Sequence, residues 1–280
     1  MPPIRVVLAH GRAAELEIAA TMSRLWGDAL LQGLQRVGSP YADQVEISYA
    51  FFGGLWRADA KPPMPVVKAG DGASYTVQLT PEPAVISADV VALGPPVGPI
   101  GRIFTKVLPD AALEGILSRA IPDVFEYLEQ REWRNAANAI VTRACMDSGA
   151  RVLIGFSMGT IVAYDVLRAA AGALPVKAFL TCGSPIGLKP IHERLLKDGP
   201  TPFPGGLDLW INVWNEDDVA TGVRGEELAA LFEGGEVQGV ETVGREPSYT
   251  SPFAAHNAPD YLSSLAMGLA LHVAIESTTV

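Results

Sequence analysis

The sequence predicts an α/β protein with one doubly wound, mostly parallel sheet flanked by helices. Two observations predict this class: short β-branched apolar runs alternate with segments of helical spacing, and one such run leads directly into a glycine-flanked turn before an apolar segment. The composition agrees, because 49% of the 280 residues are hydrophobic and only 19% are charged. We therefore expect a single domain spanning residues 1–280.

The first third of the chain reads as a strand, a helix and a second strand. Residues 4–9 form a short apolar run stopped by His10-Gly11, which is typical of a buried strand entering a turn. Residues 21–37 place apolar side chains at helical spacing, and Gly38-Ser39-Pro40 ends them. Residues 45–52 are the next strand candidate, so the two strands should be parallel.

The region of about residues 54–130 breaks this regularity. It holds proline-rich punctuation and no clean periodicity until the apolar spacing of Ile121, Val124, Phe125 and Leu128, which predicts a helix. An irregular stretch this long is a lid, a binding loop or an insertion without catalytic interest, and those alternatives stay open.

The remaining elements follow in regular alternation. Helical spacing recurs at 133–146 and ends at Gly149. The predicted order after it is strand 152–154, helix 160–171, strand 176–181, strand 207–213, a short helix and strand within 226–243, and helix 259–275.

Charge and cysteine content exclude several classes of function. The net charge of −10 and the lack of any Lys/Arg run argue against nucleic acid or an anionic membrane as partner. Two cysteines make no disulfide framework, and no Cys/His pair has metal-ligand spacing. The N-terminal apolar run is too short for a signal peptide, and no apolar stretch reaches the length of a membrane span. We expect a cytoplasmic protein without metal or cofactor. Its oligomeric state is not encoded in these patterns.

The strongest motif is Gly155-Phe156-Ser157-Met158-Gly159, which lies between a predicted strand and a predicted helix. A serine on such a sharp turn projects its hydroxyl above the edge of the sheet, and small flanking residues let strand and helix approach each other. The alternative is a glycine-rich turn whose serine caps the helix. The position predicts Ser157 as a nucleophile.

A nucleophilic serine needs a base, and only four histidines exist. His10 precedes the serine and His192 precedes the best acid, whereas the base should follow both. His272 falls within an apolar helical segment, while His256 sits in a loop just before a helix. His256 is the favoured base and His272 the alternative.

The acid that orients the base should follow a strand. Asp217 and Asp218 come directly after the strand that ends near Val213-Trp214, and Asp217 is favoured over Asp218. Asp208 precedes that strand and is the weaker candidate.

Two backbone amides should stabilise an oxyanion formed at the attacked carbonyl. One belongs to the residue after the nucleophile, Met158. The other is expected in the His10-Gly11-Arg12 loop, where glycine lets the backbone turn toward the serine, so Arg12 is the predicted second donor.

With these motifs in this order, the chain resembles the α/β-hydrolase superfamily, and within it the lipase and esterase-like branches. The Gly183-to-Gly187 segment and the spacing from His256 to Tyr261 carry the same resemblance. The resemblance implies a serine hydrolase that cleaves a carboxylic ester through an acyl-enzyme, in a fold that here lacks the leading antiparallel strands.

Three functions remain open from the sequence. The first is this esterase activity. The second is a thioesterase or amidase that uses the same triad, and the third is a hydrolase-fold protein that binds a ligand or partner without catalysis.

Overall fold

A computed structural model describes residues 3–10, 16–56, 74–76, 122–196, 202–215, 218, 221, 228, 231–242 and 255–279. In these residues a seven-stranded sheet has the order β3-β2-β1-β4-β5-β6-β7. Six neighbouring strands are parallel, and only β3 is antiparallel to its neighbour β2. The predicted α/β class with a mostly parallel sheet is confirmed.

The strands are short and largely apolar, as strands covered on both faces must be. Their bounds are β1 Ile4–Ala9, β2 Val45–Ala50, β3 Ser74–Thr76, β4 Val152–Phe156, β5 Ala178–Cys182, β6 Leu209–Trp214 and β7 Gln238–Glu241. Strands β4 and β5 are buried at every position. Strand β3 was not predicted, because three residues carry too little periodicity to be recognised.

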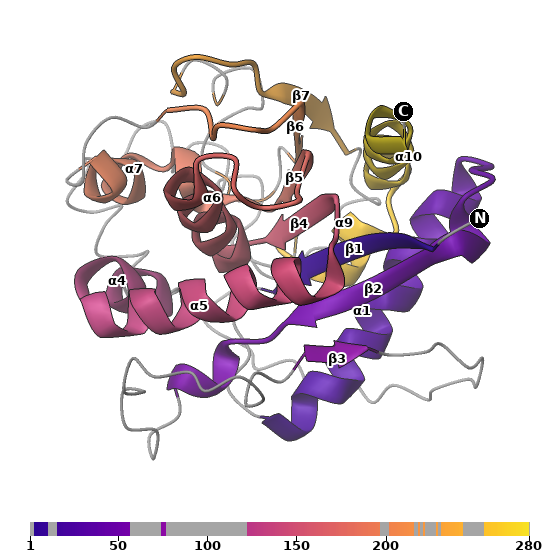
Figure 1. Cartoon of the computed structure of the whole chain (residues 1–280). Helices are drawn as coiled ribbons and strands as arrows, with labels where there is room; N and C mark the ends of the chain where they lie inside the picture. The colour runs from indigo at the N-terminus through magenta and orange to yellow at the C-terminus, as the bar shows by residue number, and fades with distance from the viewer. Residues whose placement is uncertain are drawn as a thin grey trace.

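Helices cover both faces of the sheet (Figure 1). One core cluster joins the sheet to α4 (Pro122–Glu129), α5 (Arg131–Ser148), α6 (Met158–Ala170) and α7 (Lys189–Leu196). A second joins it to α1 (Leu16–Arg36), α9 (Ala258–Leu262) and α10 (Leu265–Thr279). The 3-10 turns η1 (Ala42–Gln44), η2 (Gly53–Trp56) and η3 (Pro185–Gly187) complete the described elements.

Helix boundaries follow local chemistry. Helix α5 ends at Gly149, whose left-handed φ of 64° lets its amide bond to the Cys145 and Met146 carbonyls, as the sequence predicted. The helix expected over 259–275 is instead two helices. Ser264 separates them because its hydroxyl accepts the Met267 amide at 3.0 Å and so caps the second helix.

The predicted insertion at 54–130 can be described only in part, because residues 57–73 and 77–121 lie outside the described residues. Its last segment, α4, belongs to the main body of the protein. Val124, Phe125 and Tyr127 are buried in the first core cluster, so this helix shows ordinary packing onto the neighbouring helices.

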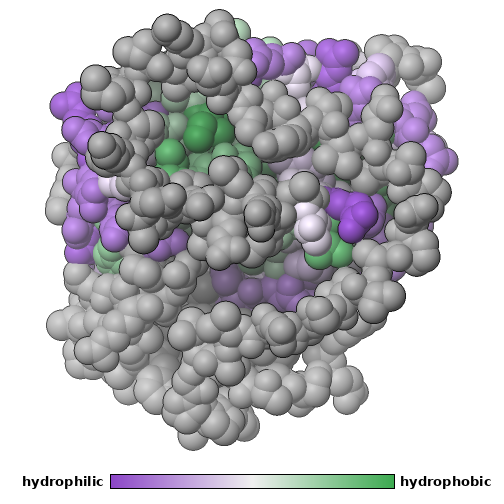
Figure 2. All heavy atoms as spheres, turned by 90° about the horizontal axis from the view of Figure 1, so that it is seen from below, coloured by the Kyte–Doolittle hydropathy of each residue, from purple (hydrophilic) through white to green (hydrophobic). Residues whose placement is uncertain are grey.

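On the face seen from below, apolar residues of the described part gather in a recess while hydrophilic residues occupy the outer margins (Figure 2). Within the described ranges, no helix has both the length and the apolarity needed to cross a bilayer.

A buried ion cluster ties α4, α5 and α6 together. Asp165 is 3% exposed and accepts hydrogen bonds from the Arg134 guanidinium, from Arg168 at 3.2 Å and from the Tyr127 hydroxyl at 2.7 Å. Removing the carboxylate takes the shared acceptor away from two partly buried guanidinium groups and a buried phenol. This loss costs far more free energy of folding than the loss of an exposed ion pair.

Asp165→Ala is therefore expected to lower the free energy of unfolding by about 3–5 kcal/mol. The measurement is the denaturant midpoint followed by circular dichroism. Asp147→Ala is the matched control: it removes an exposed pair with Arg143 and should cost less than about 1 kcal/mol. Equal losses in the two variants would contradict the prediction.

Candidate active site

The site lies where the carboxyl ends of the central strands meet. Register pairs Ala9 of β1 with Gly155 of β4, and Phe156 of β4 with Cys182 of β5. The loops that leave these strands therefore start at one edge of the sheet, which is where ligand sites of parallel sheets form. Ser157 follows β4 at this edge.

Ser157 occupies a strained turn between β4 and α6. Its φ of 52° and ψ of −126° are unusual for a residue with a side chain. A Cβ at Gly159 would lie 2.3 Å from the Ala9 carbonyl oxygen, and one at Gly155 would lie 2.8 Å from the Thr160 Cα. Only glycine fits at these two positions. The motif therefore lets α6 pack closely against the sheet and places Ser157 at the tip of the turn between β4 and α6.

Three side chains distant in sequence form a continuous chain of hydrogen bonds. Ser157 Oγ lies 2.8 Å from His256 Nε2, and His256 Nδ1 lies 2.8 Å from Asp218 Oδ2. A carboxylate only accepts, so Nδ1 must carry the proton and Nε2 must accept from the serine hydroxyl. The Asp218 side chain is fully buried, that of His256 is 14% exposed, and Ser157 is also buried, so the hydrogen-bonded chain is largely shielded by the protein.

The carboxylate in contact with His256 is Asp218, not Asp217 as favoured from the sequence. Asp217 itself lies outside the described residues. A tight turn after β6 selects Asp218, since its amide bonds to the Asn215 carbonyl at 3.1 Å and its own carbonyl accepts from Thr221. Adjacent acids in one turn cannot be told apart by spacing, because both follow the strand directly.

The His256 ring is held by two neighbours. It stacks on Phe156 with ring centroids 4.9 Å apart and an interplanar angle of 28°. Gly183, at a left-handed φ of 53°, lies close to both rings, and a Cβ there would approach His256 Nδ1 to 3.3 Å. Phe156, the residue before Ser157, thus also positions the His256 ring.

Tyr261 is a site residue that sequence reasoning did not assign. Its hydroxyl donates to Asp218 Oδ2 at 2.8 Å, and the ring is 2% exposed. Burial and the nearby Asp218 charge raise the pKa of Tyr261 well above its usual value. The only signal in the sequence was its spacing from His256.

The other three histidines contact residues outside the hydrogen-bonded chain of Ser157, His256 and Asp218. His272, the alternative base, lies on α10 and contacts Ser39 Oγ, in the turn after α1, at 3.1 Å and Glu276 at 3.5 Å. His10 Nε2 accepts the Phe52 amide at 2.9 Å, which joins the ends of β1 and β2. His192 packs edge-on against Phe232, and burial lowers its pKa.

The two predicted oxyanion donors differ in what can be described. Met158 is the first residue of α6, where a backbone amide has no carbonyl partner within the helix. The Arg12 amide lies outside the described residues, which stop at His10. The chain leaves β1 beside the serine turn, as the contact of Gly159 with the Ala9 and His10 carbonyls shows.

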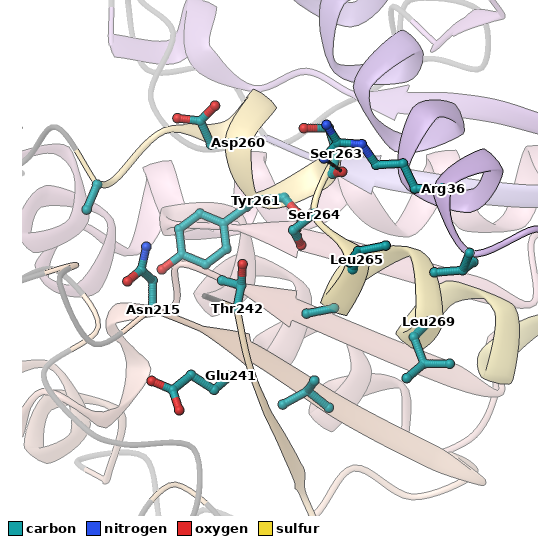
Figure 3. A pocket seen from close by; sticks show the side chains of 14 residues that line it. Arg36, Asn215, Glu241, Thr242, Asp260, Tyr261, Ser263, Ser264, Leu265 and Leu269 are labelled. Carbon is teal, nitrogen blue, oxygen red and sulfur yellow. Dashed lines mark hydrogen bonds between the residues drawn. The ribbon is translucent and has the colours of Figure 1, made fainter. Parts of the chain in front are cut away.

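A cavity of about 480 Å³ lies beside Tyr261, between the ends of α1, β7, α9 and α10 (Figure 3). Apolar walls from Val240, Leu265 and Leu269 meet polar groups that include Asn215 and Asp260. Neither Ser157 nor His256 lines it. Tyr261 therefore both lines this cavity and bonds Asp218.

Both cysteine thiols are buried, and their raised pKa values make them unreactive. Burial raises the pKa of Cys145 to about 12. Burial and the Asp218 charge raise the pKa of Cys182, which lies on β5 close to the site. Because the thiolate is the reactive form, neither cysteine can serve as a nucleophile near neutral pH.

We expect iodoacetamide at pH 8 to leave both cysteines unmodified in the folded protein and to modify both after denaturation. Intact-mass spectrometry measures the difference. Rapid modification of either thiol under native conditions would contradict the assigned burial.

No family model matches this chain, and neither the curated proteins nor the solved structures that were searched contain a match. The geometry of Ser157, His256 and Asp218 is therefore the basis for assigning a function to this chain.

Proposed function

We propose that the chain is a serine hydrolase that cleaves a carboxylic ester through an acyl-enzyme. The observation that carries the proposal is the unbroken path from Ser157 Oγ through the two nitrogens of His256 to Asp218 Oδ2, with 2.8 Å at each contact. Such a path takes a proton from the serine at the moment of attack and keeps the resulting imidazolium beside a buried negative charge.

The reaction proceeds in two halves. Ser157 Oγ attacks the acyl carbon while His256 Nε2 accepts its proton, and the same nitrogen then protonates the leaving alcohol. Water repeats the sequence on the acyl-enzyme and releases the acid. Asp218 holds the imidazole in the Nδ1–H tautomer throughout and remains ionised. Every group in this scheme is a protein side chain, a backbone amide or water.

The Met158 amide is the proposed first oxyanion donor, since it points from the start of α6 and adjoins the nucleophile. The Arg12 amide stays the predicted second donor. A strand, a strained serine turn and a helix, followed in chain order by an acid and a histidine, favour the lipase and esterase-like branch of the α/β-hydrolases as the family. The burial of both thiols favours the predicted cytoplasmic location.

Ser157→Ala is expected to reduce kcat by about 10⁴- to 10⁶-fold, because no other group supplies the attacking oxygen. The assay uses nitrophenyl esters of graded chain length, acyl thioesters and acyl anilides, together with a fluorophosphonate probe. Ser277→Ala, on the outer helix α10, is the matched control and should retain full rate and labelling.

The substrate panel separates the three functions. If esters are turned over fastest, the proposal is supported. If thioesters or anilides are turned over faster, the chain is a thioesterase or an amidase instead. A wild-type protein that the probe does not label and that turns over none of the substrates would leave only a binding role.

The choice of acid gives a second prediction. Asp218→Asn should lower kcat by about 10⁴-fold, because an amide beside Nδ1 no longer holds the imidazole in its productive tautomer. Asp217→Asn changes the adjacent residue in the same way and should stay within a few-fold of the wild type. Steady-state kinetics on the best ester decides, and the reverse pattern would restore Asp217 as the acid.

A further inference from the structure

One carboxylate oxygen of Asp218 receives hydrogen bonds from two different side chains. Oδ2 lies 2.8 Å from His256 Nδ1 and 2.8 Å from the Tyr261 hydroxyl. Because the two donors share a single oxygen, each reduces the negative charge that the other one meets. The phenol and the imidazole are therefore electrostatically coupled through Asp218.

Tyr261 is a permanent donor in this arrangement. The phenol is buried, and its pKa is raised by that burial and by Asp218, so the hydroxyl keeps its proton across the working range of a histidine base. The Asn215 backbone hydrogen-bonds the phenol and acts in the opposite direction, as the smaller influence. Figure 3 shows the Tyr261 hydroxyl directed toward Asn215, away from the body of α9.

We propose that Tyr261 is a positioning residue that fixes Asp218 Oδ2 and partly neutralises it, and so sets how tightly His256 holds its proton. The inference rests on the proposed function, because it assigns a role within the same triad. Tyr261 itself contacts neither Ser157 nor His256 Nε2, the nitrogen that faces the serine. Its effect on turnover passes entirely through the carboxylate.

The surroundings allow this effect to be isolated. The Cys182 thiol on β5 faces the same carboxylate, and it stays neutral because its own pKa is raised. On the cavity side, the charged groups are Arg36 of α1, Glu241 of β7 and Asp260 of α9. A Tyr261→Phe exchange keeps the ring that lines the cavity and leaves all of these charged groups in place. It removes the O–H group, and with it the donor to Asp218 and the contact with the Asn215 backbone.

The direction of the effect follows from charge. Without the phenol, Oδ2 has one donor fewer and presents more negative charge to Nδ1–H, which favours the imidazolium. The acidic limb of the kcat/KM profile should then move to higher pH by about half a unit to one unit. The loss of a fixed carboxylate should lower the plateau kcat about tenfold, and KM should not change, because Tyr261 does not contact substrate.

Tyr127→Phe is the matched control. Its hydroxyl also donates to a buried carboxylate, Asp165 Oδ2 at 2.7 Å, in the separate ion cluster of α4, α5 and α6. The control loses the same kind of bond and a similar amount of stability, and its pH profile should coincide with that of the wild type. A double variant tests the route: in an Asp218→Asn background, Tyr261→Phe should change kcat by less than about twofold.

A measurement independent of turnover separates this inference from the proposed function. The low-field proton resonance of His256 Nδ1–H should shift in Tyr261→Phe and not in Tyr127→Phe. If that resonance moves while wild-type Ser157 resists the fluorophosphonate probe, the hydrolase proposal fails and the coupling through Asp218 stands. If the wild type is labelled and turns over esters, but Tyr261→Phe matches its pH profile and resonance, this inference alone is overturned.

Discussion

The close approach of α6 to the end of β1 is the constraint on which the site depends. Gly159 lies so near the Ala9 and His10 carbonyls that no side chain fits between them. The helix can begin there only if the preceding residue turns sharply, and Ser157 takes that turn at a positive φ. Sheet and helix burial together offset the backbone strain, which amounts to about 1–3 kcal/mol for such a residue. The position of the Ser157 hydroxyl is a product of packing.

A second constraint is the burial of the Asp218 charge. An ionised carboxylate without solvent contact must be matched by donors, and here His256 and Tyr261 supply them from one short segment around α9. His256 and Tyr261 are thus held by the same contact that stabilises the fold. Phe156 joins them to the serine turn by stacking on the His256 ring. The hydrogen-bonded site and the tertiary structure share these residues.

The sequence sufficed for the parts of the site that local pattern determines. Ser157 stands in a motif whose glycines have a steric reason, and His256 emerged because few histidines follow the serine. Asp218 could not be chosen over Asp217 from the sequence. The turn from Asn215 to Asp218 determines which carboxylate reaches His256, and the spacing of residues does not reveal this turn. The role of Tyr261 needed the position of α9 beside the end of β6, which is a long-range contact.

The fold shows the same division. The strands β1, β2, β4, β5 and β6 and the helices α5 and α6 were found within a few residues of their bounds, because burial against the sheet imposes apolar periodicity. Helix α7 was not predicted, and α1 begins at Leu16, before its predicted start at residue 21. The break at Ser263 and Ser264 escaped notice, because apolar spacing continues across it while the capping hydroxyl of Ser264 starts a new helix. The three-residue edge strand β3 is too brief to carry a pattern.

The order of the parts along the chain has a consequence for biosynthesis. Helix α1 is made early, yet its buried face of Trp26, Leu30 and Leu34 is covered by α9 and α10, which are synthesised much later. His256 also follows Ser157 by 99 positions. A growing chain therefore carries an uncovered apolar helix, and a serine without its histidine partner, until the segment from His256 to α10 has been made and docks. Covering of α1 and assembly of the hydrogen-bonded chain from Ser157 to Asp218 thus depend on the same late segment.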